Sequence, residues 1–224
     1  LLGSEGGTFG IAEFGTKFLR GILQMPKPTT MAELVRISGL SHGTNVWQGN
    51  AELLIKEGKV TLSDVIATRD DIYNTLLEYG VEGKLAFFTM ENVRKGRGLT
   101  DEMETAMREK SVPEWFIDSC KKISYMFPKA HAVAYVTMAL RIAYFKVHHP
   151  QAYYAAYFTV RADNFDASYV TGNGDVIRAH IAAIEKKQNE GKASNNEINM
   201  ITYLEVALEM YERGIGFLQV DLSK

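Results

Sequence analysis

The chain has 224 residues, of which 46% are hydrophobic and 23% are charged, and its formal net charge is −2. A globular chain of this length buries enough apolar surface to fold without disulfides or metals. Cys120 is the only cysteine, which excludes a disulfide framework or a multi-cysteine metal site and is typical of the reducing cytoplasm. The most apolar stretch, residues 130–147, includes His131, Arg141 and Lys146, so we expect no membrane span and no membrane partner.

Neither end of the chain resembles the natural end of a protein. It begins at Leu1 without a methionine or a charged signal peptide, and it stops at Lys224 directly after an apolar run. We therefore expect an excerpt from a longer protein.

Charge is distributed unevenly along the chain. Between residues 115 and 150, Asp118 is the only acidic residue, and five lysines and arginines give this segment a net charge of about +4. Binding to phosphate depends on such local cations rather than on the total charge. The nearly neutral total therefore does not exclude a nucleic-acid or nucleotide partner.

Apolar residues recur at helical spacing and alternating strand patterns are scarce, so we predict a mostly α fold, a compact multi-helix domain with little strand. The predicted helices cover residues 12–25, 30–37, 50–57, 63 or 68 to 79, 82–95, 101–110, 113–125, 128–148, 150–160, 175–190 and 195–213. Thr68 and Thr100, each followed closely by acidic residues, are predicted N-caps. A short strand is predicted near the C-terminus, over residues 215–220.

Two polar segments rich in Gly, Asn and Ser, residues 163–175 and 191–196, are predicted loops. The second of them divides a final helical hairpin from the rest of the chain. We predict a core over residues 1–162 and a helical appendage over residues 163–224 that leads to the next domain.

The helix predicted to start at Pro128 lacks a capping residue, because Met126 and Phe127 offer no side-chain oxygen to its free N–H groups. Lys129 and His131 add positive charge at the positive end of the helix dipole. An anion would complement both features, so this helix start is a candidate phosphate site. The alternative is that a neighbouring carboxylate caps the helix and that His131 lies in the core.

Arg94, Lys95 and Arg97 form a second basic cluster, at the end of one predicted helix and in the loop that follows. Cations in a last helical turn before glycine are common at any helix C-terminus, which gives an ordinary structural explanation. Arg97 lies beyond that end, in a glycine-flanked loop from which a guanidinium can close on a phosphate.

Residues 38–47 form a third group, with two serines, a histidine and two glycines ahead of Trp47, and we predict that they form a loop. Ordinary turn chemistry explains such a composition. Loops with glycines and convergent donors also hold ligands, so Ser41, His42 and Gly43 are candidate pocket residues.

Other polar residues indicate structure rather than chemistry. Asp70 and Asp71 point about 100° apart on a predicted helix, so we interpret them as acids of its first turn rather than as metal ligands. Cys120 has no neighbouring base and is predicted to be a buried thiol. We predict no metal site and no catalytic residue within this chain.

Five segments resemble, in order, the PolC-type DNA polymerase III α subunit of Gram-positive, low-GC bacteria. They are ISGLSHGTNVW (37–47), VRKGRGL (93–99), VPEWFIDSCKK (112–122), YMFPKAHAVAY (125–135) and RIAYFKVHHP (141–150). The resemblance extends over residues 7–222 and places the chain in the fingers region, which follows the palm. The FPKAHA segment is also similar to the more distant DnaE replicases. Asn45 departs from the family pattern, which has aspartate at this position.

The resemblance implies template-directed DNA synthesis, in which a primer 3′-hydroxyl attacks the α-phosphate of an incoming dNTP. It implies two Mg²⁺ ions held by palm aspartates outside this chain, which alone is then expected to be inactive. The implied partners are dNTP, primer–template DNA, other polymerase domains and replisome proteins such as the sliding clamp.

The resemblance also suggests roles for the candidate residues. The nucleotide-binding residues are expected to be Arg94, Lys95, Arg97, Lys129, His131 and Tyr135. The pocket for the base, which in this family accepts guanine-like anilinouracil inhibitors, is expected to be lined by Ser41, His42, Gly43 and Phe127. Tyr135 has an alternative interpretation as a core residue.

Two other classes of function compete with this one. The first is a non-catalytic helical module that binds nucleic acid or a partner helix through the basic segment. The second is an independent small-molecule enzyme, which the absence of paired carboxylates and of a nucleophile–base pattern disfavours.

Overall fold

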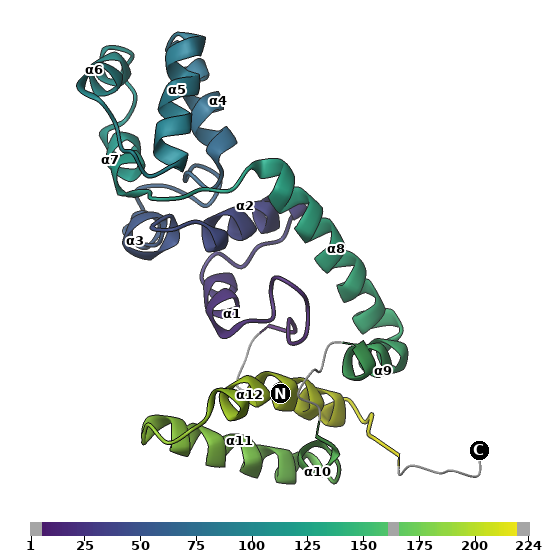
Figure 1. Cartoon of the computed structure of the whole chain (residues 1–224). Helices are drawn as coiled ribbons and strands as arrows, with labels where there is room; N and C mark the ends of the chain where they lie inside the picture. The colour runs from purple at the N-terminus through teal and green to yellow at the C-terminus, as the bar shows by residue number, and fades with distance from the viewer. Residues whose placement is uncertain (1–5, 161–165, 219–224) are drawn as a thin grey trace. The chain divides into compact units, whose positions relative to one another are not determined.

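The computed structural model describes residues 6–160 and 166–218, and it is built from α-helices (Figure 1). Among these residues no β-strand forms, and one isolated antiparallel bridge joins Thr44 to Tyr125. The predicted mostly α fold is confirmed. The described residues group into two compact units, which we call the middle unit (Met25–Thr137) and the terminal unit (Leu1–Gln24 with Met138–Lys224).

The middle unit consists of short helices that follow one another closely. They are α2 (Met31–His42), the wide helical turn η1 (Trp47–Ala51), α3 (Glu52–Lys56), α4 (Arg69–Glu78), α5 (Gly83–Arg94), α6 (Asp101–Glu109), α7 (Glu114–Lys122) and the first part of α8 (Lys129–His148). Helices α4 and α5 pack side by side as a hairpin (Figure 1). Its turn contains Gly80 with a φ of +81°, a conformation that glycine adopts at little cost.

The predicted caps of α4 and α6 are confirmed. Thr68 is the N-cap of α4, and its N–H donates to the Asp71 carboxylate at 2.8 Å. Thr100 caps α6 by accepting a hydrogen bond from the N–H of Met103 at 3.3 Å. Such caps satisfy N–H groups that a helix leaves free, and each stabilises the fold by about 1 kcal/mol.

The core of the middle unit is apolar and contains the single thiol. Its fully buried side chains include Ile37, Leu40, Ile66, Ile72, Leu76, Met107, Phe116, Ile117, Ile123 and Met126. Cys120 is completely buried, and this burial raises the pKa of its thiol. The predicted buried thiol is therefore confirmed, and because the thiolate is the reactive form, burial makes this thiol unreactive.

The terminal unit combines both ends of the chain. It contains α1 (Lys17–Gln24), the second part of α8, α9 (Pro150–Val160), α10 (Ala167–Val170), α11 (Gly174–Asn189) and α12 (Asn195–Glu212). Helices α11 and α12 form a hairpin (Figure 1). The residues predicted as an appendage therefore pack in one unit with the N-terminal residues, while the functional boundary at residue 162 stays a prediction.

A buried ion pair lies inside the terminal unit. The Lys146 Nζ is 2.6 Å from the Glu209 carboxylate, and it also donates to the carbonyl oxygens of Gly7 and Phe9. The Tyr154 hydroxyl donates to the same carboxylate at 3.0 Å. Burial lowers the pKa of Lys146, and the carboxylate opposes this effect by stabilising the charged ammonium.

Helix α1 begins at Lys17, whereas the prediction placed its start at residue 12. Gly10 and Glu13 have φ values of +68° and +69°, and this left-handed backbone interrupts a helix. The side chain of Thr16 then caps α1 by accepting from the N–H of Leu19 at 3.2 Å.

Helix α2 continues to His42, so the predicted loop over residues 38–47 is wrong for residues 38–42. Gly39 does not mark a turn. A Cβ on Gly39 would lie 2.6 Å from the carbonyl oxygen of Ala67, so glycine allows α2 to pack closely on that backbone.

Three further boundaries differ from the predictions. Helix α7 ends at Lys122 instead of residue 125, because the chain becomes extended at Ile123. Helix α10 lies inside the predicted loop over residues 163–175, of which residues 163–165 fall outside the described residues. The predicted strand over residues 215–220 is wrong for 215–218, and residues 219 and 220 are not described.

Candidate functional site

The extended residues 124–127, between α7 and α8, connect the regions that the sequence singled out, and we call them the central segment. On one side, the N–H of Ser124 donates to the carbonyl of Thr44 at 3.1 Å. The N–H of Thr44 in turn donates to the carbonyl of Tyr125 at 2.9 Å. The corner that follows His42 is therefore paired with the central segment.

The other backbone groups of the central segment bind the ends of α5 and α4. The N–H of Met126 donates to the carbonyl of Arg94 at 3.3 Å, and the carbonyl of Phe127 accepts from the N–H of Arg69 at 3.1 Å. Three parts of the chain thus converge just before the start of α8. They are the turn over residues 94–98, which we call the basic loop, the start of α4 and the corner after α2.

Two glycines permit this convergence. A Cβ on Gly96, whose φ is +68°, would lie 2.5 Å from the carbonyl oxygen of Ser124. A Cβ on Gly43 would lie 2.8 Å from the carbonyl oxygen of Tyr125. Gly43, predicted from the sequence as a pocket residue, therefore has a packing role at the central segment.

Arg94 and Lys95 share one carboxylate. The Arg94 Nε is 2.5 Å from Glu91 Oε1, and the Lys95 Nζ is 2.7 Å from Glu91 Oε2. The hydrogen bond from Arg94, and then that from Lys95, lowers the pKa of Glu91 to about 2. Glu91 therefore stays ionised and holds the two cations in place, with one positive charge left over.

Arg97 differs from its two neighbours. Its backbone N–H donates to the carbonyl of Asn92 at 2.9 Å, which fixes the turn after α5. Its side chain is exposed and forms no ion pair within residues 6–160 and 166–218. Of the basic cluster, Arg97 is therefore the cation that can bind a ligand without giving up a partner.

A carboxylate caps the start of α8. The N–H of Lys129 donates to Asp70 Oδ2 at 2.7 Å, so the predicted alternative of a capping carboxylate holds for this N–H group. The interpretation of Asp70 as merely a first-turn acid of α4 is incomplete, because its side chain serves the neighbouring helix. This helix start does bind an anionic group, and in the structure that group belongs to the protein.

The Lys129 side chain lies beside a polar cavity of about 550 Å³ in the middle unit. Acidic, basic and aromatic side chains line it, among them Arg36, Lys59, Asp64, Asp71, Glu78, Tyr79, Trp115 and Lys129. The Lys129 side chain is exposed and forms no ion pair among the described residues.

A row of rings runs from the central segment onto α8. The rings of Phe127 and His131 stack at 4.8 Å with an angle of 21°, and His131 lies 4.4 Å from Tyr135. His42 and Tyr125 both meet Phe127 edge-on, at 5.5 and 5.4 Å. Three predicted residues of the base pocket and nucleotide site, namely Phe127, His131 and Tyr135, therefore form one continuous ring row.

The exposure of these rings bears on their alternative roles. Tyr135 is 38% exposed, which contradicts its interpretation as a core residue. His131 and Phe127 are half-buried, so His131 is neither a core residue nor fully solvated. In this row the Tyr135 ring is accessible to a ligand, and the half-buried rings of His131 and Phe127 pack against one another next to it.

Ser41 and Asn45 lie on the α2 side of the central segment. The Ser41 hydroxyl donates to the carbonyl of Ser38 at 2.9 Å, inside α2, and keeps its lone pairs for a ligand. Asn45 has a φ of +58° and its amide donates to the Ser124 hydroxyl at 3.0 Å. An aspartate at this position would accept from the same hydroxyl instead, so asparagine and aspartate differ in the direction of this bond.

Sequence reasoning missed three residues of this arrangement, namely Asp70, Glu91 and Tyr125. Each acts on a partner brought to it by the fold or by a helical turn, and no spacing marks Asp70 or Tyr125 as part of a site. The spacing of Glu91 three and four residues before Arg94 and Lys95 is the one available signal, because such pairs meet on a helix surface.

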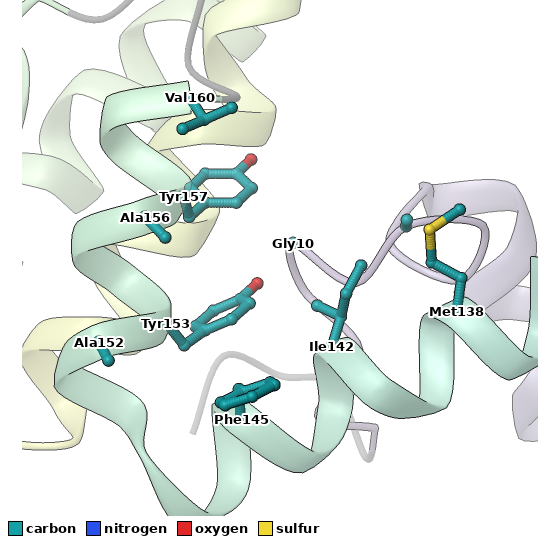
Figure 2. A pocket seen from close by; sticks show the side chains of 10 residues that line it. Gly10, Met138, Ile142, Phe145, Ala152, Tyr153, Ala156, Tyr157 and Val160 are labelled. Atoms are coloured by element: carbon teal, nitrogen blue, oxygen red, sulfur yellow. The ribbon is translucent and has the colours of Figure 1, made fainter.

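A separate apolar cavity of about 420 Å³ lies in the terminal unit (Figure 2). Helices α8 and α9 and the segment around Gly10 enclose it, and Figure 2 shows the rings of Phe145, Tyr153 and Tyr157 on its walls. None of the predicted site residues lines it.

The described residues contain neither a candidate membrane span nor a cluster of metal ligands. None of the helices is both long and apolar enough to cross a membrane. No three His, Cys, Asp or Glu side chains in the described ranges lie together as metal ligands, so we assign no metal ligand in this chain.

Taken together, fold and site define an all-helical domain that gathers cations, a helix start and a ring row around one extended segment. The chain belongs to the family described as the bacterial DNA polymerase III alpha subunit finger domain, whose model matches residues 2–114. The expected PolC-type fingers region is confirmed.

Proteins named DNA polymerase III PolC-type are similar over the whole chain. The protein of Caldanaerobacter subterraneus subsp. tengcongensis is 58% identical over 223 residues, 100% of this chain and 16% of that protein. The protein of Bacillus subtilis is 58% identical over 223 residues, 100% of this chain and 15% of that protein. That of Thermotoga maritima is 54% identical over 223 residues, 100% of this chain and 16% of that protein. The chain thus spans 15–16% of the length of these relatives.

Proposed function

We propose that this chain is the fingers part of a replicative DNA polymerase and binds the incoming dNTP and the primer–template during template-directed synthesis. The convergence of the basic loop, the start of α8 and the ring row on the central segment is the observation that carries the proposal. Other polymerase domains, replisome proteins such as the sliding clamp and a cytoplasmic location are expectations that follow from it.

The triphosphate is assigned to the cations around the central segment. Arg97 and Lys129 contribute free charges, His131 adds a ring nitrogen, and the start of α8 adds the N–H of Lys129, which donates to Asp70 in this structure. Arg94 and Lys95 contribute less, because Glu91 already neutralises one of their two charges.

Asp70 constrains how a phosphate can bind at the start of α8. Its carboxylate occupies the N–H of Lys129, and two anions do not share one donor without repulsion. A triphosphate bound there takes the place of Asp70, and the Asp70 side chain turns away from α8.

The nucleoside end is assigned to the ring row. Phe127, with His42 at its edge, offers an apolar wall for the base, and Ser41 and Gly43 border the same corner. Tyr135, the most exposed ring of α8 in this row, packs against the sugar or the base.

The chemistry assigned to this chain is positioning and charge neutralisation. Phosphoryl transfer depends mainly on these two effects, and Mg²⁺ supplies further neutralisation when it is bound. The described residues do not form a cluster that fits the ion. Its ligands are therefore assigned to the palm, outside this chain, and the chain alone is expected to show no primer extension.

Nucleotide titration tests the proposal. In the whole polymerase, Lys129→Ala and Arg97→Ala should each lower the efficiency of dNTP incorporation by about tenfold to a hundredfold, because each removes a charged phosphate contact. Primer–template affinity should barely change. Lys84→Ala is the matched control, since Lys84 is an exposed cation on α5 without an ion pair in the described ranges.

Two outcomes would argue against the proposed function. Unchanged dNTP efficiency in both variants would remove the phosphate site. Binding of DNA by this chain without any response to free dNTP would instead favour the non-catalytic nucleic-acid-binding module.

A further inference from the structure

The last turns of α8 carry a second group of rings, which begins nine residues after Tyr135 of the ring row. Tyr144 and His148 lie with their centroids 4.5 Å apart, and Phe145 and His149 lie 5.9 Å apart. Tyr144 and Phe145 meet edge-on at 5.9 Å. We call these four residues the ring cluster.

Two pairs at i and i+4 create the ring cluster, because residues four apart lie on the same face of a helix. Burial does not explain it. Tyr144 is 56% exposed and Phe145 is 53% exposed, and both histidines are exposed as well. Phe145 has one edge on the apolar cavity, as Figure 2 shows, whereas Tyr144 does not line it.

The chain segment that carries the ring cluster contains no acidic residue. Residues 138–160 contain no aspartate or glutamate. Arg141 precedes Tyr144 by three residues and Phe145 by four, so it lies on the same helix face. Its side chain is exposed and has no ion pair within the described part of the chain.

We propose that the ring cluster, with Arg141, binds single-stranded nucleic acid. Exposed aromatic rings stack on unpaired bases, and histidine rings do so as well. A nearby guanidinium binds the phosphate that follows along the strand. A strand needs both kinds of contact, and this helix face supplies both without a repelling carboxylate in residues 138–160.

A strand fits these observations better than a protein partner does. Protein interfaces also use tyrosine, phenylalanine and arginine, but the two further exposed imidazole rings, which stack on bases as well, favour the strand. Base stacking tolerates any base sequence because every base has a π-face, so a polymerase can use such a platform on any template. The inference rests on the proposed function in this respect, since a polymerase must hold an unpaired template strand.

Fluorescence anisotropy with a labelled oligothymidine of about 16 nucleotides tests the inference in the absence of dNTP. We expect this chain to bind the single strand more tightly than a duplex of the same length. Tyr144→Ala should weaken binding about tenfold, because one stacked base is lost. Arg141→Gln should lower the slope of log affinity against log salt by about 0.7.

Three control variants separate stacking from other causes. Tyr144→Phe keeps the ring and should bind like the parent chain. Tyr144→Leu keeps apolar surface without a π-face and should bind as weakly as Tyr144→Ala. Phe88→Ala removes a ring of similar exposure, 49%, from α5 in the middle unit and should have no effect. Thermal unfolding of each variant shows whether it is folded.

The inference is overturned if the folded parent chain does not bind the oligonucleotide, or if Tyr144→Ala loses no more affinity than Phe88→Ala. It is also overturned if Tyr144→Leu binds like the parent, a result that would point to an apolar protein partner. Lys129→Ala should keep its oligonucleotide affinity. Unchanged dNTP use by Lys129→Ala, together with intact strand binding, would therefore remove the proposed nucleotide site and leave this inference standing.

Discussion

Gly96 and the carbonyl of Ser124 are so close that a Cβ on Gly96 would lie 2.5 Å from that oxygen. This contact joins the basic loop to the central segment. Gly98, two residues later, has a similar φ of +73°, but a Cβ on Gly98 would have no atom within 4 Å. Both glycines adopt a positive φ that strains other residues, and of the two only Gly96 also lacks room for a side chain.

The pair gives a matched test of the basic loop. Gly98→Ala should lower the free energy of unfolding by about 1 kcal/mol, the strain of a left-handed non-glycine residue. Gly96→Ala should cost about 2 kcal/mol more, because the Ser124 carbonyl must move, and it should also weaken dNTP binding. Urea unfolding and nucleotide titration of both variants measure these effects. Equal losses of stability would show that the close approach has no energetic role.

Replacement of Asp70 separates capping from charge at the start of α8. Asp70→Asn keeps an oxygen for the Lys129 N–H and should leave stability almost unchanged. It removes a negative charge beside the proposed phosphate position and should tighten dNTP binding about fivefold, equivalent to about 1 kcal/mol.

Asp70→Ala removes both features, so it should lower the free energy of unfolding by about 1 kcal/mol and also tighten nucleotide binding. Calorimetric titration and thermal unfolding measure the two effects. Weaker dNTP binding by a fully stable Asp70→Asn variant would show that Asp70 assists the nucleotide instead of competing with it.

The carboxylate of Glu91 makes stability depend on pH. Its pKa is lowered from 4.5 to about 2 in the folded chain, first by the hydrogen bond from Arg94 and then by that from Lys95. A lowered folded pKa means that the stabilisation is complete above pH 4.5 and is lost as the pH falls toward 2. Solvent screens this partly open pair, so its contribution at neutral pH is below about 1 kcal/mol.

Urea unfolding at about pH 6 and about pH 3 measures this contribution. Glu91→Gln should show a smaller loss of stability between the two pH values than the parent chain. An identical loss in both would mean that other carboxylates account for the acid sensitivity.

The buried pair of Lys146 and Glu209 predicts a large effect in the terminal unit. Glu209→Gln leaves an ammonium buried without its counter-charge and should lower the free energy of unfolding by about 3 kcal/mol. Glu190→Gln, which breaks an exposed pair with Lys192, should change it by less than about 0.5 kcal/mol. Urea denaturation measures the free energy of unfolding of both variants. A small loss of similar size in both would show that water reaches Lys146.

Local signals made most of the fold predictable. Thr68 and Thr100 cap their helices through atoms three residues away, so the caps can be inferred from sequence. Gly39 misled the prediction because glycine is common in turns, whereas here it serves a contact with Ala67, distant in sequence. A rule based on neighbouring residues cannot tell these two uses of glycine apart.

The sequence was enough to predict several residues of the candidate site, but not how the fold brings them together. Lys129, His131 and Arg97 stand out because their charges or loop position are unusual. That the segments carrying them converge at residues 124–127 depends on backbone pairing between parts of the chain about 30 to 80 residues apart, which no local pattern encodes. The capping role of Asp70 was missed for the same reason, since its partner is the start of another helix.

The complete burial of Cys120 has a practical consequence. Because it is the only thiol and lies in the core, a cysteine introduced at an exposed position such as Tyr135 or Tyr144 would be the one rapidly labelled site in the folded chain. Environment-sensitive dyes could then report separately on the ring row and the ring cluster. The slow reaction of Cys120 itself with a thiol reagent would measure how often the middle unit opens.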